Sequence, residues 1–518
     1  MIMETQDSLL RDISETNSPS QPRSLSRRQF ALTGAAAATA LAIAPRHVLG
    51  RTSKPDPRAL VETHPAVEGE DLSQEYTVTV NGLAVPVYTA KLMPQYNDNS
   101  APQWDPSHTY IYNGKSNPPW DPAYSFASFE FSGRVTVTIS SSKPLTALFI
   151  RPSTPAIHAK LKGNTATFTL TQPGNFAIER NGNGRKDPLL LFANPIESER
   201  PREGDPNVIY YGPGRHNAGM IHLTSNQTLY IAGGAVVTGA VVAQGDNIKI
   251  IGRGLLENAG AEYKGKNMIL LKQCTRARIE GIIIRKDSRE WTVVQRDCDG
   301  VTLANIKLCC SYSFNDDGLD MVNSRNMTIE DCFIRTNDDC LAFKGMESAD
   351  GNCENITVRR CCLWGDGCGI LAFGDECRAA YMRNITIEDC HVLYLSFEGN
   401  PKKFLLMHAG EDMWMENIRM ENIDIHGEGQ NRNLITIDCE INRFNKKKVP
   451  GHIRNILLKN VKLTGKDGPY QIVIKGYSDQ YPVDGVTFQH CKINGRPITA
   501  DSPNVHIGEF TKNIKFIT

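Results

Sequence analysis

A nine-residue phrase recurs along the second half of the chain and limits the possible folds more than any other feature. Its nine copies begin at residues 247, 276, 300, 326, 355, 384, 417, 455 and 485, at intervals of 29, 24, 26, 29, 29, 33, 38 and 30 residues. Typical copies read NMTIEDCFI and NITIEDCHV. A β phrase this short cannot bury its own apolar face, so each copy must stack on its neighbours. The repeat therefore predicts a right-handed parallel β-helix.

Apolar side chains fill positions two, four, seven and nine of the phrase, and we expect these positions to face the interior of each coil. Position seven is Ile or Val in several copies and cysteine in four others: Cys332, Cys361, Cys390 and Cys491. Because cysteine takes the place of a small hydrophobic residue there, we expect these four to be buried and reduced rather than disulfides or metal ligands.

The chain before the repeats is expected to form a β domain of its own. Between residues 73 and 205, runs such as Tyr76–Val80 and Thr165–Leu170 alternate apolar and polar residues and are separated by turn residues, which is typical of an antiparallel β-sandwich. Residues 206–518 contain the repeats. The predicted fold class is all-β, a right-handed parallel β-helix preceded by a small β-sandwich domain.

The N-terminal 50 residues have the pattern of an export signal. Arg27 and Arg28 precede the apolar stretch 31–44, which resembles a twin-arginine signal and is shorter than the roughly 20 residues needed to span a bilayer. Residues 51–72, rich in proline and charge, are expected to be a linker. We therefore expect an exported protein, periplasmic or extracellular, without a membrane span.

The charge balance excludes two classes of partner. The chain has 57 basic and 57 acidic residues, so no net field attracts nucleic acid or an anionic membrane. We expect a monomer. Fourteen cysteines in an exported chain also raise the possibility of disulfides. The sequence leaves open whether pairs form among Cys309, Cys340, Cys353, Cys362, Cys368 and Cys377.

A second series of strands follows the phrases, for example LDMVN from Leu319 and CLAFKG from Cys340. Because coils stack about 4.8 Å apart, the residues just before these strands form a ladder, and a cleft along it would suit a long, linear ligand. Two adjacent rungs are acidic, with Asp316 and Asp317 on one and Asp338 and Asp339 on the next. Aspartates are common at β-helix corners, but paired acidic rungs cost repulsion and so favour catalysis.

Carboxylates on adjacent coils suit hydrolysis of a glycosidic bond. An inverting glycosidase needs an acid and a base roughly 6.5–9.5 Å apart, with a water between them. Crowding of carboxylates raises the pKa of at least one, which supplies the acid. Acid, base and water suffice for this reaction, so we expect no metal and no organic cofactor.

These acidic rungs resemble the signature of glycoside hydrolase family 28, the polygalacturonases, which reads N-T-D-G-x-D and then D-D-C-x-A. The segment NDDGLDMVN matches the first motif, and DDCLA matches the second. The resemblance implies inverting hydrolysis in which Asp338 is the general acid, while Asp317 and Asp339 hold and deprotonate the water. It also implies structural roles for Asp316 and Asp320.

Two positions depart from the family pattern. The family's G-H-G falls on Gly367-Cys368-Gly369, and its R-I-K falls on residues 405–407, which carry no cation for a uronate carboxylate. Lys402, Lys403 and His408 lie close by. The order of a sandwich before a β-helix is similar to the dextranase family, family 49, which acts on a neutral α-glucan. We expect contacts to a polysaccharide or oligosaccharide from Asn315, Trp291, Cys368, Lys344 and His408.

Three alternatives remain open from the sequence. One is a true polygalacturonase with an altered uronate contact. Another is a polysaccharide lyase, which would use a calcium-binding acidic cluster and a Lys or Arg base. The third is a non-catalytic, glycan-binding β-helix, which would need no acidic pair.

Overall fold

The computed structural model describes residues 59–92, 123–182, 187–258, 266–311, 315–346, 351–395, 404–427 and 433–518, and the backbone of β5 (Ile111–Tyr112) and β6 (Lys115–Ser116). The expected signal segment 1–50, residues 51–58 of the expected linker, Lys402 and Lys403 lie outside the described residues. Within the described residues, no helix has the length and apolar character needed to cross a membrane. The described elements are all strands, and the predicted all-β fold class is confirmed.

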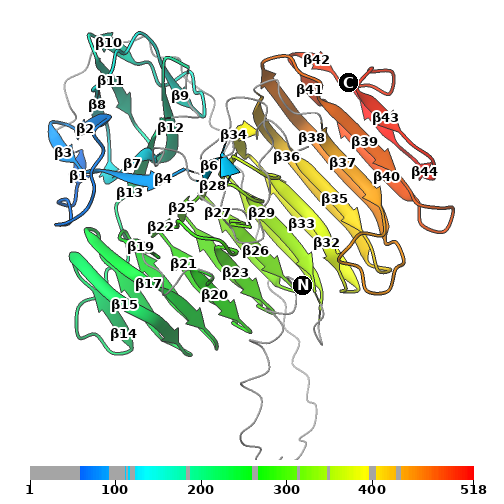
Figure 1. The fold of residues 1–518 in the computed structure, drawn as a ribbon, viewed down its shortest axis with the longest axis horizontal. Coiled ribbons are helices and arrows are strands. Elements are labelled where there is room, and N and C mark those ends of the chain that lie inside the picture. The colour runs from blue at the N-terminus through cyan, green and yellow to red at the C-terminus, as the bar shows by residue number, and fades with distance from the viewer. Residues whose placement is uncertain are drawn as a thin grey trace, which may run out of the picture. The chain divides into compact units, whose positions relative to one another are not determined.

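Two small sheets precede the repeats (Figure 1). The six-stranded sheet contains β1 (Leu60–Glu62), β4 (Val87–Lys91), β7 (Ala123–Ser132), β9 (Leu148–Arg151), β12 (Gly174–Arg180) and β13 (Leu189–Pro195). The five-stranded sheet contains β2 (Tyr76–Val80), β3 (Leu83–Val85), β8 (Val135–Ser141), β10 (Lys160–Lys162) and β11 (Thr165–Leu170). Alternate residues of these strands point inward and share one apolar core.

Two details of this part differ from expectation. Residues 60–72 do not form a free linker, because β1 pairs with β7 and Val67 is buried. Proline and charge content, on which the linker expectation rests, does not exclude an edge strand. The sheets are also not wholly antiparallel: β13 runs parallel to β7, because the chain passes through the other sheet before it returns.

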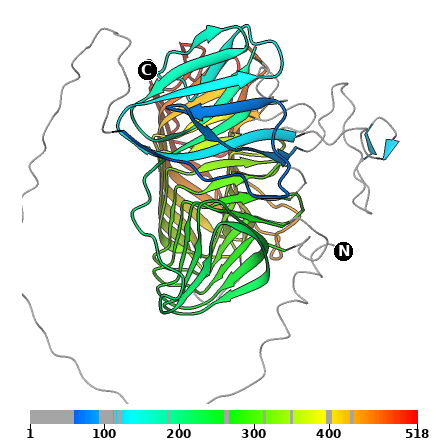
Figure 2. The same cartoon turned by 90° about the vertical axis from the view of Figure 1, so that its left-hand side faces the viewer.

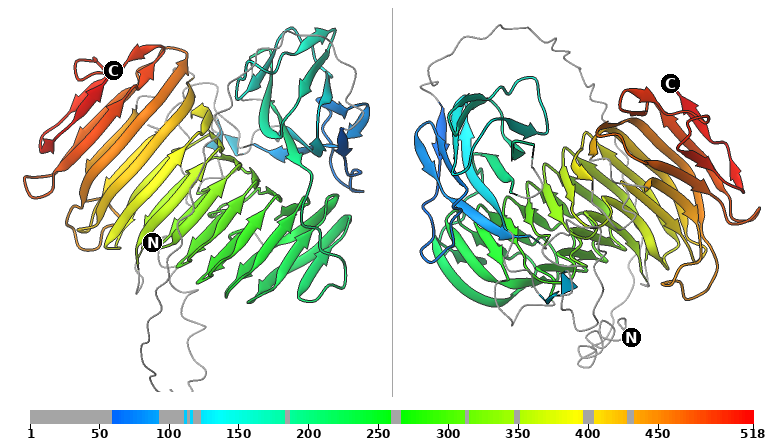
Figure 3. Two further views of the ribbon diagram at one scale, coloured as in Figure 1. Left: turned by 180° about the vertical axis from the view of Figure 1, so that it is seen from behind. Right: turned by 45° about the horizontal axis from the view of Figure 1, so that its top comes forward.

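Residues from 208 onward form one 32-stranded sheet, wound so that each strand pairs with a strand of the next coil. Among the described strands of this sheet, the ladders are parallel except for the terminal β41–β42 pair, and Figure 3 shows the strands following one another in the same direction. We number three ladders by their order within a coil.

The first ladder contains β14 (Val208–Tyr211), β16 (Thr228–Ile231), β18 (Lys249–Gly252), β21 (Arg278–Glu280), β24 (Thr302–Ala304), β27 (Arg325–Glu330), β30 (Cys353–Arg359), β33 (Tyr381–Glu388), β36 (Trp414–Gly427), β38 (His452–Gly465), β40 (Val483–Gln489), β44 (Thr511–Lys512) and β45 (Lys515–Ile517). The second contains β15 (Gly214–Leu223), β19 (Leu255–Glu257), β22 (Ile283–Arg285), β25 (Lys307–Cys309), β28 (Phe333–Thr336), β31 (Cys362–Gly365), β34 (His391–Leu395), β41 (Lys492–Ile493) and β42 (Arg496–Pro497), together with parts of the long strands β17 (Ala235–Ala243), β36 and β38, which pair with β19, β34 and β41. The third contains β17 (Ala235–Ala243), β20 (Ile269–Lys272), β23 (Val293–Arg296), β26 (Leu319–Val322), β29 (Leu341–Gly345), β32 (Leu371–Cys377), β35 (Leu405–Ala409), β37 (Asn433–Cys439), β39 (Gln471–Lys475) and β43 (Val505–Ile507).

The nine-residue phrase is a strand pair with a bend rather than one straight strand. In the copy at 326, Asn326 and Asp331, at positions one and six, both have positive φ, 55° and 57°. Asn and Asp tolerate this left-handed conformation better than other residues with side chains. The extra residue at position six explains why the apolar positions change from two and four to seven and nine: the chain turns and the inward face is restored.

Asparagine side chains connect successive copies of the phrase. The amide of Asn355 donates to the carbonyl oxygen of Asn326 at 3.1 Å, and the same bond recurs from Asn384 to Asn355 at 3.0 Å. Asn417 and Asn455 continue the series. Each bond fixes the register between neighbouring coils, and that register sets which residues of the third ladder lie side by side.

The interior of the coils is the core that the phrase predicts. In the copies from 276 onward, residues at positions two, four, seven and nine join one continuous apolar cluster, which includes Cys332, Cys361, Cys390 and Cys491. The copy at 247 departs from this pattern, because its position seven is Arg253 and its position nine, Leu255, faces the N-terminal sheets. Cys361 hydrogen-bonds with Cys332, and its N–H donates to the sulfur of Cys390 at 3.4 Å. All fourteen cysteines lie among the described residues, and none of them forms a disulfide.

The N-terminal sheets pack against the outside of the second ladder. Tyr124, Phe126 and Phe192 of β7 and β13 share an apolar cluster with Phe333 and Trp364 of β28 and β31. The rings of Phe192 and Phe333 meet edge to face with centroids 5.2 Å apart. Figure 2 shows the blue and cyan strands of this part against the green coils.

Candidate active site

The acidic rungs lie immediately before β26 and β29, on neighbouring coils. The strands pair with Leu319 opposite Leu341, and the N–H of Gly318 donates to the carbonyl of Asp339 at 2.8 Å. This register places Asp317 opposite Asp339. The next coil pairs Leu341 with Leu371, and the N–H of Cys340 donates to the carbonyl of Gly369.

Asp316 is buried and holds the two acidic turns together. Its carboxylate accepts backbone N–H bonds from Ser311 at 3.0 Å, Asn337 at 3.0 Å and Asp338 at 2.9 Å. Hydrogen bonds to a charged group contribute about 1.5–3 kcal/mol each. Burial nevertheless raises the pKa of Asp316 to about 7, with a further increase from the nearby charge of Asp338. Its side chain is only 1% exposed, so we assign it to the scaffold.

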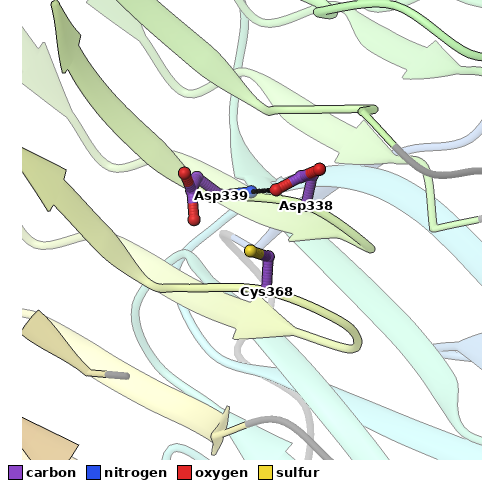
Figure 4. Close-up of side chains that lie close together, drawn as sticks. All are labelled: Asp338, Asp339 and Cys368. Atoms are coloured by element: carbon purple, nitrogen blue, oxygen red, sulfur yellow. Dashed lines mark hydrogen bonds between the residues drawn. The ribbon is translucent and has the colours of Figure 1, made fainter. Parts of the chain in front are cut away.

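Asp338, Asp339 and Cys368 form a partly exposed group (Figure 4). Their oxygen and sulfur atoms all lie within 4.8 Å of one another. Asp338 accepts the N–H of Asp339 at 3.1 Å and the N–H of Asn315 at 3.0 Å, and Asp339 accepts the N–H of Gly369 at 2.9 Å. The backbone thus fixes both carboxylates while leaving them accessible.

Lys344 is a buried cation beside Asp317, and Lys286 is another, near Asp316. The Nζ of Lys344 lies 3.5 Å from Asp317, 3.8 Å from Asp320 and 3.4 Å from Glu376. Burial lowers the pKa of Lys344, but the carboxylates of Glu376, Asp317, Asp320 and Asp339 outweigh burial and raise it well above its ordinary value. Lys344 therefore stays charged, and one ammonium faces several carboxylates.

Asp317 and Asp320 interact as a buried pair. Burial is the main cause that raises the pKa of both carboxyls, to about 8 for Asp320 and well above the ordinary value for Asp317, and Lys344 opposes it. The side chain of Asp317 is 5% exposed and that of Asp320 is 0% exposed. Two adjacent buried carboxylates repel each other, which disfavours ionisation of both, and Lys344 lies slightly closer to Asp317 than to Asp320.

Trp291 and Asn315 lie at the edges of this group. Trp291 is 8% exposed, and the ammonium of Lys344 lies 4.3 Å from the centre of its ring. This cation–π contact helps to hold the ammonium of Lys344 in place. Asn315 has a positive φ of 57°, and its backbone N–H, rather than its side chain, makes the hydrogen bond to Asp338.

His408 lies two coils farther along the third ladder, on β35, outside the aspartate group. Leu405 and Met407 face the core, so neither presents a side chain to the outer surface. The outward-facing positions are Leu406 and His408. Of the residues matched to R-I-K, Leu406 alone faces outward, and it carries no charge.

Three carboxylates surround the imidazole of His408. Its Nδ1 lies 2.9 Å from Asp375 and 3.1 Å from Glu440, and its Nε2 lies 3.1 Å from Asp438. Burial lowers the pKa of His408, but these carboxylates outweigh burial and raise it. The outer surface here carries more negative than positive charge. Donor atoms suited to a metal ion also come together in Asp375, His408 and Glu440, and in Asp338, Asp339 and Cys368.

Several of these residues were absent from the sequence prediction. Asp375, Glu376, Asp438 and Glu440 were not singled out, although each lies in or next to a strand of the third ladder. The two-residue alternation of LITIDC marks Asp438 as outward-facing, and this signal was available. Glu376 lies within a register shift between β29 and β32, so the two-residue alternation of the sequence does not predict which way its side chain faces.

The fold is a parallel β-helix with carboxylates on adjacent coils and a sandwich before it. The model of glycosyl hydrolases family 28 matches residues 212–512. This match covers more than half of the chain, and the chain belongs to that family.

Individual relatives support the same placement. The polygalacturonase of Medicago sativa is 29% identical over 235 residues, which are 43% of this chain and 52% of that protein. Polygalacturonase QRT2 of Arabidopsis thaliana is 23% identical over 227 residues, 43% of this chain and 48% of that protein. The chain thus spans about half the length of these curated relatives. Dex49A from Penicillium minioluteum is 15% identical, with a TM-score of 0.61 over 86% of this chain and 96% of that chain, and shares its fold.

The burial of the cysteines gives a direct test of this geometry. Cys368 is partly exposed, whereas the other thirteen cysteines are buried. We expect a small thiol reagent such as methyl methanethiosulfonate to add one label to the native protein, at Cys368, and fourteen labels after unfolding, as measured by mass spectrometry. The variant Cys368→Ser should take up no label while native. Several labels on the native protein, or none after unfolding, would contradict the structure.

Proposed function

We propose that this protein hydrolyses glycosidic bonds in a polysaccharide or oligosaccharide by single displacement with inversion. The observation that carries the proposal is the register of β26 and β29, which sets Asp317 opposite Asp339 with Asp338 beside them. Three carboxylates on two adjacent coils can supply a proton donor and a water-holding pair at one glycosidic bond. Family membership supports the same reaction.

Asp338 is assigned as the general acid. It is partly exposed, and its position is fixed by two backbone N–H bonds, so its carboxyl can reach the leaving oxygen of a bound sugar. Asp317 and Asp339 are assigned to the attacking water. Asp339 accepts the N–H of Gly369, which orients its carboxylate, and Lys344 provides the positive charge that favours ionised Asp317.

Asp320 helps to reconcile the raised pKa of Asp317 with a role as a base. In the pair, Asp320 is the less exposed carboxyl, and a proton held there leaves Asp317 ionised. The expected structural role of Asp320 is thus extended: it stores the proton that the buried pair must keep. The pH range for activity should then depend on Lys344.

A neutral sugar is the favoured substrate class. On the coils after Cys368, the outward position of β35 nearest the aspartates is the apolar Leu406, and the next is His408, whose charge is already matched by three carboxylates. A uronate carboxylate would meet a surface with excess negative charge there, whereas sugar hydroxyls can donate to carboxylates.

A true polygalacturonase is the second candidate. The relatives from Medicago sativa and Arabidopsis thaliana carry that name, and Lys344 offers one buried cation near the aspartates. For either substrate, the twin-arginine-like segment supports export to the place where such polymers occur.

Removal of Lys344 should move the pH profile. In Lys344→Met the cation beside Asp317 is lost, so the pKa of Asp317 rises further. Activity requires the ionised form, so the acid limb of the kcat/KM profile should shift to higher pH. Lys462→Met, on an exposed position of β38, is the matched control and should leave the profile in place. An unchanged or lowered acid limb in Lys344→Met would contradict the assignment of Asp317 as the base.

Substitution of each aspartate should separate the acid from the base pair. The wild type is first screened against dextran, other α-glucans and polygalacturonate, with products resolved by size. Asp338→Asn should slow cleavage of the polymer by about 10²–10⁴ and cleavage of an aryl glycoside much less, because an aryl leaving group needs little protonation. Asp317→Asn and Asp339→Asn should slow both substrates alike.

The matched control for this series is Asp389→Asn. Asp389 lies at position six of a phrase copy and accepts the side-chain amide of Asn422, away from the aspartate group. Its substitution should leave both activities near the wild-type level. If Asp338→Asn kept normal turnover of the polymer, the residue-by-residue assignment would be wrong. Unsaturated products from the wild type would support the lyase alternative instead.

A further inference from the structure

A buried arginine connects the sandwich to the segment that carries Asp338 and Asp339, residues 335–340, which we call the catalytic turn. Arg335 of β28 is fully buried, and its guanidinium lies 4.1 Å from the ring centre of Tyr124 and 4.1 Å from that of Trp364. Tyr124 belongs to β7 of the sandwich, whereas Trp364 belongs to β31 of the next coil. The guanidinium is thus held between one ring from each part of the molecule.

Asp366 joins this arginine to Ser311, whose backbone N–H donates to Asp316. Its Oδ2 accepts the Nε–H of Arg335 at 2.7 Å and the hydroxyl of Ser311 at 2.6 Å. Its Oδ1 accepts the indole N–H of Trp364 at 2.9 Å. Asp366 is 1% exposed, so a buried carboxylate is matched by a buried guanidinium and by two further donors.

Tyr124 also contacts the residue next to Ser311 directly. Its hydroxyl donates to the carbonyl of Cys310 at 2.9 Å, one residue before Ser311. Ser311 in turn donates its backbone N–H to Asp316, and Asp316 accepts the N–H of Asp338. A continuous series of contacts therefore runs from a sandwich residue to the backbone of the proposed general acid.

We propose that Tyr124 is a positioning residue for the catalytic turn, so that the sandwich forms part of the active-site scaffold. The hydroxyl of Tyr124 donates to the carbonyl of Cys310, and its ring contacts the guanidinium of Arg335. Arg335 lies three residues before Asp338 in the chain. The inference rests on the proposed function, because it concerns the placement of the general acid. It assigns to the sandwich a role in catalysis without contact to the sugar.

A purely structural role would have a different consequence. If Tyr124 only filled the interface between the two parts, loss of its hydroxyl would lower stability and leave the turn at 335–340 unchanged. If it positions the turn, loss of the hydroxyl bond should loosen the backbone around Asp338 while the sugar-binding surface stays intact. Turnover would then fall without a change in substrate affinity.

The test compares Tyr124→Phe with Tyr230→Phe. Tyr124→Phe keeps the ring over Arg335 and removes the hydroxyl. Tyr230→Phe also removes one buried hydroxyl, which donates to Glu197 at 2.9 Å at the N-terminal end of the coils. Hydrogen exchange of the peptide covering residues 335–340 is measured for both variants and the wild type, together with thermal unfolding, kcat and KM on the polymer that the wild type cleaves.

Tyr124→Phe should exchange faster in this peptide and lose about tenfold in kcat at unchanged KM, whereas Tyr230→Phe should match the wild type in both. Exchange needs no substrate, so it decides the positioning role even if the protein cleaves none of the polymers tested. Equal exchange of residues 335–340 in Tyr124→Phe and the wild type would overturn the inference. An equal increase in both variants would do so as well.

Discussion

The register between neighbouring coils is the constraint on which the rest of the structure depends. Parallel strands a single coil apart bring residues distant in sequence to within about 4.8 Å along each ladder. A shift of one residue would turn every side chain of a strand to the opposite face. The left-handed asparagines and their amide bonds, such as that from Asn355 to Asn326, fix this register. Asp317 lies opposite Asp339 only because the register holds.

Buried charge is the second theme of the site. Asp316, Asp317, Asp320, Lys344 and Asp366 are all largely buried, and an unpaired charge there would cost several kcal/mol. The protein meets this cost in different ways: Asp316 accepts backbone N–H bonds, Asp366 is matched by a buried arginine, and Asp317 and Asp320 lie beside the ammonium of Lys344. Asp338 and Asp339 are partly exposed, so their carboxylates keep contact with solvent and are accessible to a ligand.

The sequence revealed the coils and their inward positions, because that periodicity repeats nine times, and it revealed the acidic rungs through a local motif on two adjacent coils. It did not reveal contacts that cross between the two parts. Tyr124, Arg335 and Asp366 are far apart in the chain, and no motif connects them. The strand in residues 60–62 was also not expected, since proline and charge content carry no information about strand pairing.

The stereochemistry of the reaction tests the central claim most directly. Proton NMR of the wild-type protein with a polymer that it cleaves would follow the anomeric signal of the new reducing ends before mutarotation. A base pair that activates water opposite the general acid predicts that the first product has the inverted anomeric configuration. A first product with retained configuration, or one with an unsaturated terminal sugar, would contradict the account.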